Sequence, residues 1–309
     1  MMNNEEYLIK LKKLNELVIM HPNYASVMNE ISASYEQHKA IGVPKNILCI
    51  GPSGVGKSTL VKQIVNKYKK EALLDTQMHP ILIVATPPKP NIRNFAEAFL
   101  IALNDPMSSK GGAIEKTSRL NDLLKRKKVK MIIVDELQHF VEHGIGNALR
   151  EVSDWLKSVS DQSGVSTILI GLEKCEEVFY SNEQIRRRFS QTIELKAFSI
   201  EDTEDITIFS SVIRELDNQI GLKNKIDLSE ENIERLYYAT NGLIDYLIKL
   251  LLGALEIAYK EKKKGIDIRL LETAFRSKIW RVCTNESNPF NKAFIPQKLD
   301  KPKMPFHVG

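Results

Sequence analysis

The segment Gly51–Ser58 constrains the fold of this chain more strongly than any other part of its sequence. It reads Gly-Pro-Ser-Gly-Val-Gly-Lys-Ser and matches the phosphate-binding pattern G-x-x-x-x-G-K-[ST] at every fixed position. The apolar run 47–50 precedes it, and a helical pattern from Lys57 to about Lys70 follows it. We therefore expect a strand, a loop and a helix in succession, with loop N–H groups and the start of the helix surrounding a phosphate.

Three further apolar runs have the length of buried strands, and a strand-like segment follows them: 81–85, 131–134, 167–170 and 192–195. Amphipathic helical patterns at 92–103 and 149–159 separate these runs. Strands that are apolar throughout and alternate with helices are typical of a parallel sheet covered on both faces. The sequence therefore predicts an α/β fold.

The pattern changes along the chain in a way that predicts four parts. Residues 1–45 read as an N-terminal helical extension, and 46–197 as the α/β core with the phosphate loop. No strand pattern returns after Phe198, so 198–282 is predicted to be a small all-helical domain. The segment 283–309 holds four prolines and few apolar anchors, and we expect an extended tail there.

Two acidic residues follow the predicted strand 131–134. In open α/β sheets ligands bind at the carboxyl ends of the strands, so Asp135 and Glu136 are expected near the phosphate loop. Asp135 would hold Mg²⁺ through water, and Glu136 would polarise an attacking water, which favours hydrolysis over transfer to another acceptor. Lys57 would reach the β- and γ-phosphates of ATP, and the Ser58 hydroxyl would be a direct metal ligand. The predicted nucleotide-binding residues are Gly51, Pro52, Ser53, Gly54, Val55, Gly56, Lys57, Ser58 and Thr59.

Three consecutive arginines, 186–188, precede Phe189. A guanidinium is well suited to stabilise the γ-phosphate charge from a neighbouring subunit. Arg188 is our first candidate for this role and Arg187 the second. A solvated basic turn or a nucleic-acid contact are the alternatives.

Composition sets limits on location and partners. No apolar run approaches the length of a membrane span, and the polar N-terminus does not resemble a signal peptide. The three cysteines have neither CxxC nor zinc-site spacing, which favours reduced thiols and a cytoplasmic protein without a membrane partner. The net charge of +5 permits a polyanionic partner without requiring one.

Several motifs together resemble the TniB/TnsC-like AAA+ ATPases, which regulate DNA transposition. The resemblance covers roughly residues 18–280. The motifs that carry it are His21-Pro22, Gly51–Thr59, the proline cluster 87–90, Val134-Asp-Glu-Leu-Gln138-His139, Arg188-Phe189 and Thr240-Asn-Gly242.

The resemblance implies a parallel five-stranded αβα ATPase core followed by a helical lid. It also implies a homo-oligomeric ring or filament that assembles on double-stranded DNA with ATP and recruits or activates a transposase, with a target-selection protein as a further partner. Two departures from the family pattern are compatible with slow hydrolysis and leave the identity of the sensing residues open. The strand at 167–170 ends without a polar sensor, and Asp245 stands where many relatives have an arginine. Gln138 and His139 are then candidates for sensing the γ-phosphate, or simply cap the strand end.

DNA contacts are expected between the second and third strands. By analogy with the family this region faces the pore, and the contacts would be made by Lys89, Arg93, Lys110, Lys116 and Arg119. Lysine-rich runs at 67–70, 125–130 and 260–264 are expected to be solvated helix ends. No aromatic stacking platform accompanies the candidate cations, so backbone contacts with little sequence preference are predicted.

Two other functions share the same ATPase residues. The chain would load a helicase or transposase if it were a replication-initiator or insertion-sequence helper ATPase. A nucleotide-switched signalling module would oligomerise without DNA.

The predicted tail, residues 283–309, would serve as a docking strip for a partner protein or be an ordinary chain end.

Overall fold

The computed structural model describes residues 4–74, 78–142, 146–176 and 183–307. The chain forms two compact units. The sheet unit comprises 23–53 and 57–195, and the helical unit comprises 1–22, 54–56 and 196–309. Residues 1–45, which we predicted as one extension, are therefore divided between the two units.

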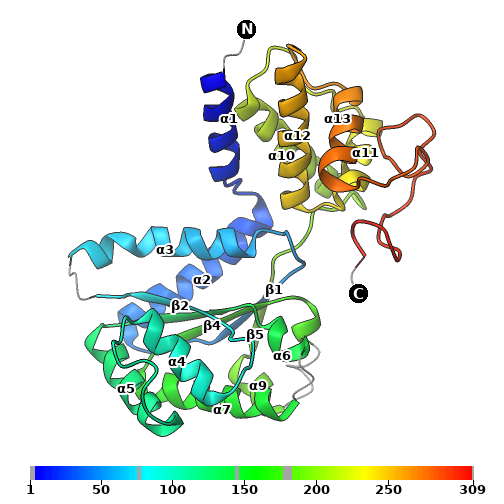
Figure 1. The fold of residues 1–309 in the computed structure, drawn as a ribbon. Coiled ribbons are helices and arrows are strands. Elements are labelled where there is room, and N and C mark those ends of the chain that lie inside the picture. Colours follow the sequence, from blue (N-terminus) through cyan, green and yellow to red (C-terminus); the bar gives the residue numbers. More distant parts are fainter. Residues whose placement is uncertain (1–3, 75–77, 143–145, 177–182, 308–309) are drawn as a thin grey trace. The chain divides into compact units, whose positions relative to one another are not determined.

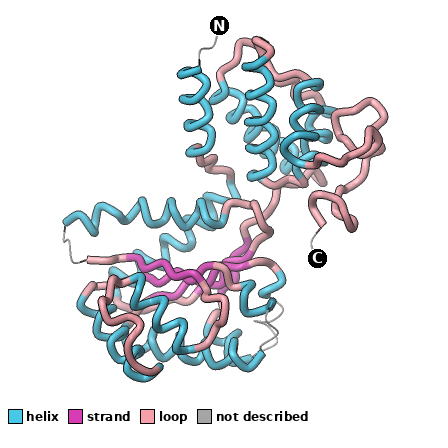
Figure 2. Tube along the Cα trace, viewed as in Figure 1, coloured by secondary structure: helices cyan, strands magenta, loops and turns pink. Residues whose placement is uncertain are grey.

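A five-stranded parallel sheet forms the centre of the sheet unit, as predicted (Figures 1 and 2). Its strands are β1 (Ile47–Ile50), β2 (Ile81–Ala85), β3 (Met131–Asp135), β4 (Ser166–Gly171) and β5 (Gln191–Glu194). Their order in the sheet is β2-β3-β4-β1-β5. From β1 the chain crosses to β2 at one edge of the sheet, and from β4 it crosses over β1 to β5 at the other edge. The connections on the two sides of β1 therefore run in opposite directions, and ligands of open α/β sheets bind at such a point.

Helices cover both faces of this sheet, because its strands are apolar on both sides. In Figure 1, α2 (Pro22–Ile41) and α3 (Lys57–Leu74) lie on one face. The other face carries α4 (Ile92–Ala102), α5 (Ala113–Arg126) and α7 (Gly146–Ser163). Two shorter helices, α6 (Gln138–Glu142) and α9 (Glu183–Arg188), complete the unit.

The core beneath α4, α5 and α7 combines alternate strand residues with large aromatic rings. Phe95 and Phe99 are fully buried among the apolar side chains of β2, β3 and β4. The Phe95 ring stacks on Phe140 at 5.4 Å, and the Phe99 ring meets Trp155 edge-on at 5.6 Å. These contacts fix the carboxyl ends of the strands relative to the helices that follow them.

The helical unit contains no strand among its described residues, in agreement with the prediction for 198–282. It consists of α1 (Asn4–Glu16), α10 (Thr203–Ile220), α11 (Glu230–Thr240), α12 (Ile244–Lys260), α13 (Ile268–Ala274) and the π-helix η1 (Phe275–Ile279). The N-terminal helix α1 packs here: Lys10 donates to the Ile220 carbonyl at 2.7 Å, and the Tyr7 ring stacks on Tyr259. None of the helices in the described ranges has both the length and the apolar composition of a membrane span.

The Thr240-Asn-Gly242 motif is a close backbone contact inside the helical unit. Asn241 and Gly242 have φ values of 50° and 67°, in the left-handed region that ends a helix. A Cβ on Gly242 would lie 2.0 Å from the Phe198 carbonyl oxygen, and the Phe198 N–H donates to the Gly242 carbonyl at 2.8 Å. Only glycine fits this approach.

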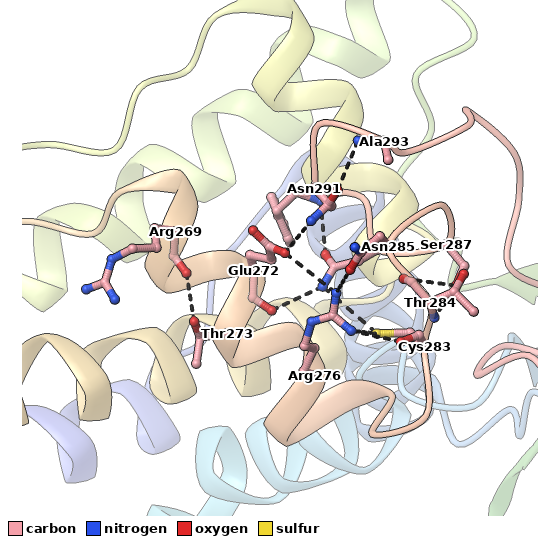
Figure 3. Close-up of polar contacts among 12 residues, drawn as sticks. Arg269, Glu272, Thr273, Arg276, Cys283, Thr284, Asn285, Ser287, Asn291 and Ala293 are labelled. Carbon is pink, nitrogen blue, oxygen red and sulfur yellow. Dashed lines mark hydrogen bonds and ion pairs between the residues drawn. The ribbon is translucent and has the colours of Figure 1, made fainter.

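The tail differs from its prediction, because it is anchored. Phe290, Leu299 and Phe306 are buried in the core of the helical unit, although no helix or strand forms in the described residues 283–307. Figure 3 shows how polar contacts fasten its first part: Arg276 of η1 donates to the Cys283 carbonyl at 2.8 Å and to the Asn285 side chain at 2.7 Å. The segment is irregular yet folded back onto α13 and η1.

Candidate nucleotide-binding site

The glycine-rich loop occupies the predicted position between the end of β1 at Ile50 and the start of α3 at Lys57. Gly54 and Gly56 have φ values of 78° and 107°, which side chains rarely adopt. The loop can therefore turn its N–H groups inward at the N-terminus of α3, an arrangement suited to a phosphate. The Ser53 and Ser58 side chains are exposed at this loop.

Lys57 is folded over the loop. Its Nζ donates to the carbonyl oxygens of Gly51 and Pro52, both at 2.7 Å. Burial lowers the pKa of Lys57, while the carboxylates of Asp135 and Glu136 act in the opposite direction. The ammonium therefore lies within electrostatic reach of both acids.

Asp135 is the last residue of β3, and β4 alone separates β3 from β1. Two strand spacings correspond to about 10 Å, which a triphosphate and a metal ion can bridge. Burial raises the pKa of the Asp135 carboxyl, whereas the Glu136 N–H and the Lys57 ammonium lower it. The structure thus brings together the loop, the lysine and the two acids at the carboxyl edge of the sheet.

Glu136 has an unusual backbone conformation for a residue with a side chain. Its φ is 64°, in the left-handed region. Its N–H donates to Asp135 Oδ1 at 2.8 Å, and the Gln138 amide donates to Glu136 Oε2. Strained backbone of this kind is tolerated mainly where neighbouring contacts enforce it, and it is concentrated at functional sites.

Three residues that the sequence did not single out support this turn. Thr86, directly after β2, donates to the Asp135 carbonyl through its N–H at 2.9 Å and its hydroxyl at 2.7 Å. Leu137 N–H donates to the Ile170 carbonyl at 3.1 Å. A Cβ on Gly171 would lie 2.9 Å from the Leu137 Cβ, so the glycine leaves room for Leu137 across the end of β4. This glycine stands in the part of β4 where the sequence showed no polar sensor.

The donor set fits a magnesium–nucleotide complex better than a metal held by protein alone. Within the described residues there is no group of three or more His, Cys, Asp or Glu side chains that could hold a metal ion. Ser58 and Asp135 supply one hydroxyl and one carboxylate. Mg²⁺ commonly takes only one or two protein ligands and completes its shell with water and phosphate oxygens.

Cys49 lies on β1 just before the loop as a buried free thiol. Burial raises its pKa to about 12. The thiol is therefore neutral and contributes packing rather than charge to the floor of the site. Cys175 and Cys283 are free and buried as well, so none of the three cysteines forms a disulfide.

The exposure of the three arginines does not follow our ranking, which put Arg188 before Arg187 as the residue that reaches a neighbouring subunit. Arg188 forms an ion pair with Asp154 of α7, and its side chain is only 17% exposed. Arg187 is 79% exposed and pairs with Glu183 one helical turn away at 2.7 Å. Arg186 is exposed as well. Because Arg188 is held within its own chain, Arg187 is better placed to reach a second copy.

One predicted DNA contact is wrong. Lys116 is fully buried, where its Nζ pairs with Glu97 at 2.6 Å and donates to the Ser108 carbonyl at 2.5 Å. Arg119 binds the same loop, donating to Asp105 and to the carbonyls of Met107 and Lys110. These two cations fasten the connection between α4 and α5. The remaining candidates, Lys89, Arg93 and Lys110, are exposed.

This arrangement predicts a stability effect for Lys116→Met, which keeps the aliphatic stem and removes the ammonium. The Ser108 carbonyl would lose its partner and Glu97 its counter-charge, so we expect the free energy of unfolding to fall by about 2 kcal/mol. Urea denaturation measures this loss of stability, and the same change at Lys125, an exposed lysine of the same helix, is the control. Unchanged stability of Lys116→Met, with a loss of DNA affinity, would restore Lys116 as a DNA contact.

The family model described as "Bacterial TniB protein" matches residues 11–199, more than half of the chain. Among curated proteins none matches. Among solved structures, the ORC2 protein of Aeropyrum pernix in ADPNP–ADP complexes is similar with a TM-score of 0.64 and 14% identity, covering 89% of this chain and 73% of that chain.

Two further structures are similar to this chain. The ORC1 protein of Aeropyrum pernix in complex with DNA has a TM-score of 0.64 and 14% identity, covering 87% of this chain and 68% of that chain. Domain III of the replication initiation protein DnaA from Thermotoga maritima has a TM-score of 0.50 and 17% identity, covering 86% of this chain and 96% of that chain. At these identities the likeness concerns the fold, which is that of AAA+ ATPases. Together with the phosphate loop and its paired acids, the match to the family model means that this chain belongs to the bacterial TniB family.

Proposed function

We propose that this protein is an ATP-dependent, DNA-binding regulator of transposition that assembles on target DNA and recruits or activates a transposase. One observation carries the proposal: the Lys57 ammonium lies within electrostatic reach of Asp135 and Glu136 at the carboxyl edge of the sheet, in a chain of the TniB family. Hydrolysis of ATP would then control how long the assembly persists.

The proposed chemistry assigns one task to each group. Lys57 exchanges its two carbonyl partners for the β- and γ-phosphate oxygens of ATP. Ser58 and Asp135 would hold Mg²⁺, which neutralises developing phosphate charge when bound. Glu136 orients the attacking water and accepts its proton.

Slow, regulatory turnover is supported by what the site lacks. The end of β4 is occupied by Gly171, with Leu137 packed against it, instead of a polar side chain. In the helical unit, Asp245 stands at the position where an arginine was expected and pairs with Lys249 at 2.6 Å. The end of β4 offers no side-chain donor for the γ-phosphate, so Arg187 from a second copy is the proposed source of that charge.

DNA binding would use the exposed cations Lys89, Arg93 and Lys110, which lie before α4, on it, and in the α4–α5 connection. The ORC1 protein, which shares this fold, was solved in complex with DNA. We expect tight binding to random duplex DNA with a non-hydrolysable ATP analogue, and weak binding without nucleotide. Affinity should fall steeply with salt, because phosphate contacts release counterions.

A fluorescence anisotropy titration of labelled duplex DNA, with and without the ATP analogue and over a range of salt concentrations, measures both the affinity and its salt dependence. DNA binding that is absent in every nucleotide state would contradict the proposal and favour a signalling module that oligomerises without DNA.

A second candidate function, loading of a helicase in the manner of a replication initiator, is favoured by the likeness to DnaA domain III, a part of a replication initiation protein. It shares the ATPase residues and DNA binding. Pull-down of the assembled, nucleotide-bound protein with a purified transposase or a replicative helicase separates the two, because each hypothesis requires a different partner.

A further inference from the structure

Gln138 has a side-chain arrangement that the nucleotide-binding pattern does not explain. It is the first residue of α6, two residues after Glu136, and its amide donates to Glu136 Oε2. The donor in this contact is the amide nitrogen, so the NH₂ group of Gln138 faces Glu136. The amide carbonyl oxygen Oε1 must therefore point away from it.

That carbonyl oxygen is buried and has no hydrogen-bond partner among the described residues. A buried acceptor left without a partner costs about 1–3 kcal/mol. An apolar side chain of similar size at this position would avoid the cost. Unsatisfied buried groups of this kind require an explanation, and they are often tolerated for function rather than stability.

The turn that carries both residues is held from several directions. Glu136 has its left-handed backbone, and Leu137 is fixed by the Ile170 carbonyl and by the space at Gly171. Thr86 holds the Asp135 carbonyl from β2. With the backbone held, the remaining freedom of Glu136 is the rotation of its side chain, and the Gln138 amide restricts that rotation.

We propose that Gln138 is a positioning residue for the ATPase reaction: it holds one oxygen of Glu136 and so aims the other at the attacking water. The inference rests on the proposed function, because it requires that Glu136 activates water. Correct orientation of a base toward its proton contributes to rate without contributing to binding of the substrate.

Gln138→Leu tests this directly, since leucine fills similar space without either polar group. We expect kcat for ATP hydrolysis to fall about tenfold or more. Affinity for a non-hydrolysable ATP analogue should stay within about threefold, because Gln138 does not touch the nucleotide in this assignment. Thermal stability should be unchanged or higher, because the orphaned carbonyl is removed. Gln37→Leu, the same change at an exposed position of α2, is the matched control.

A double-mutant cycle with Glu136→Gln, followed in single-turnover reactions, distinguishes positioning from a general structural role. If Gln138 acts through Glu136, adding Gln138→Leu to Glu136→Gln should cause little further loss. A fully additive loss, full kcat in Gln138→Leu, or a parallel fall of kcat, affinity and stability would overturn the assignment. A wild-type protein that binds ATP and never hydrolyses it would instead overturn the proposed function, and the assignment with it.

Discussion

A Lys57→Ala variant is expected to lose nucleotide-dependent assembly completely. The Lys57 ammonium lies at the loop itself, where it donates to the carbonyls of Gly51 and Pro52 at 2.7 Å. Without it, the β- and γ-phosphates keep only backbone dipoles as partners, so we expect affinity for ATP to fall about a hundredfold or more. Light scattering after gel filtration, with and without an ATP analogue, measures the assembly.

Lys62→Ala is the matched control, because Lys62 is an exposed lysine of the same helix, α3, one turn further on. It should assemble like the wild type. The fold should survive in both variants, since Lys57 fills no part of the apolar core. Assembly that persists in Lys57→Ala would show that nucleotide binding at this loop does not drive it.

The second large effect is expected for Glu136→Gln, which should bind ATP and accumulate in the assembled state. Glutamine keeps the size of the side chain and adopts the left-handed backbone of position 136 as readily as glutamate. What is lost is the carboxylate that takes a proton from water, an effect of about a hundredfold or more on turnover. Phosphate release and the lifetime of DNA-bound assemblies should therefore change in opposite directions.

Glu173→Gln provides the control for charge alone. Glu173 also raises the pKa of Lys57, as Glu136 does, but it follows β4 rather than β3. Its removal should leave turnover close to the wild-type rate. Ordinary turnover in Glu136→Gln, or an equal loss in Glu173→Gln, would remove Glu136 from its proposed role.

The core of the fold was predictable because its signals are local. Each strand is a short apolar run, and the phosphate loop fixes the order strand, loop, helix around Gly51–Ser58. The carboxyl-end rule for parallel sheets then places Asp135 and Glu136 at the same edge of the sheet as Lys57, and both acids lie within electrostatic reach of its ammonium. The rule concerns position alone, so the chemical roles of Asp135, Glu136 and Lys57 remain proposals.

Charged residues were harder to interpret, because a sequence does not reveal which of them are buried. Lys116 and Lys110 look alike in the sequence, yet the first is fully buried against Glu97 and the second is exposed. Arg188 and Arg187 are adjacent, yet only Arg188 reaches Asp154. Each difference depends on partners from distant segments of the chain.

The tail and the turn after β3 illustrate two other limits. The anchors Phe290, Leu299 and Phe306 are spaced without period, so no helix or strand pattern announces their burial. The contact between Gln138 and Glu136 depends on a left-handed backbone at a glutamate, which residue preferences do not predict. The Asp-Glu-Leu-Gln-His motif is visible in the sequence, whereas the contact inside it is visible only in the structure.

The most direct test of the site is a structure of the protein assembled on duplex DNA with Mg²⁺ and a non-hydrolysable ATP analogue. We expect the γ-phosphate within hydrogen-bonding distance of Lys57 Nζ, and the metal ion between Ser58 and Asp135. The carboxylate of Glu136 should face the γ-phosphate with room for one water. A nucleotide bound elsewhere, or one whose γ-phosphate lies out of reach of both Lys57 and Glu136, would contradict the account.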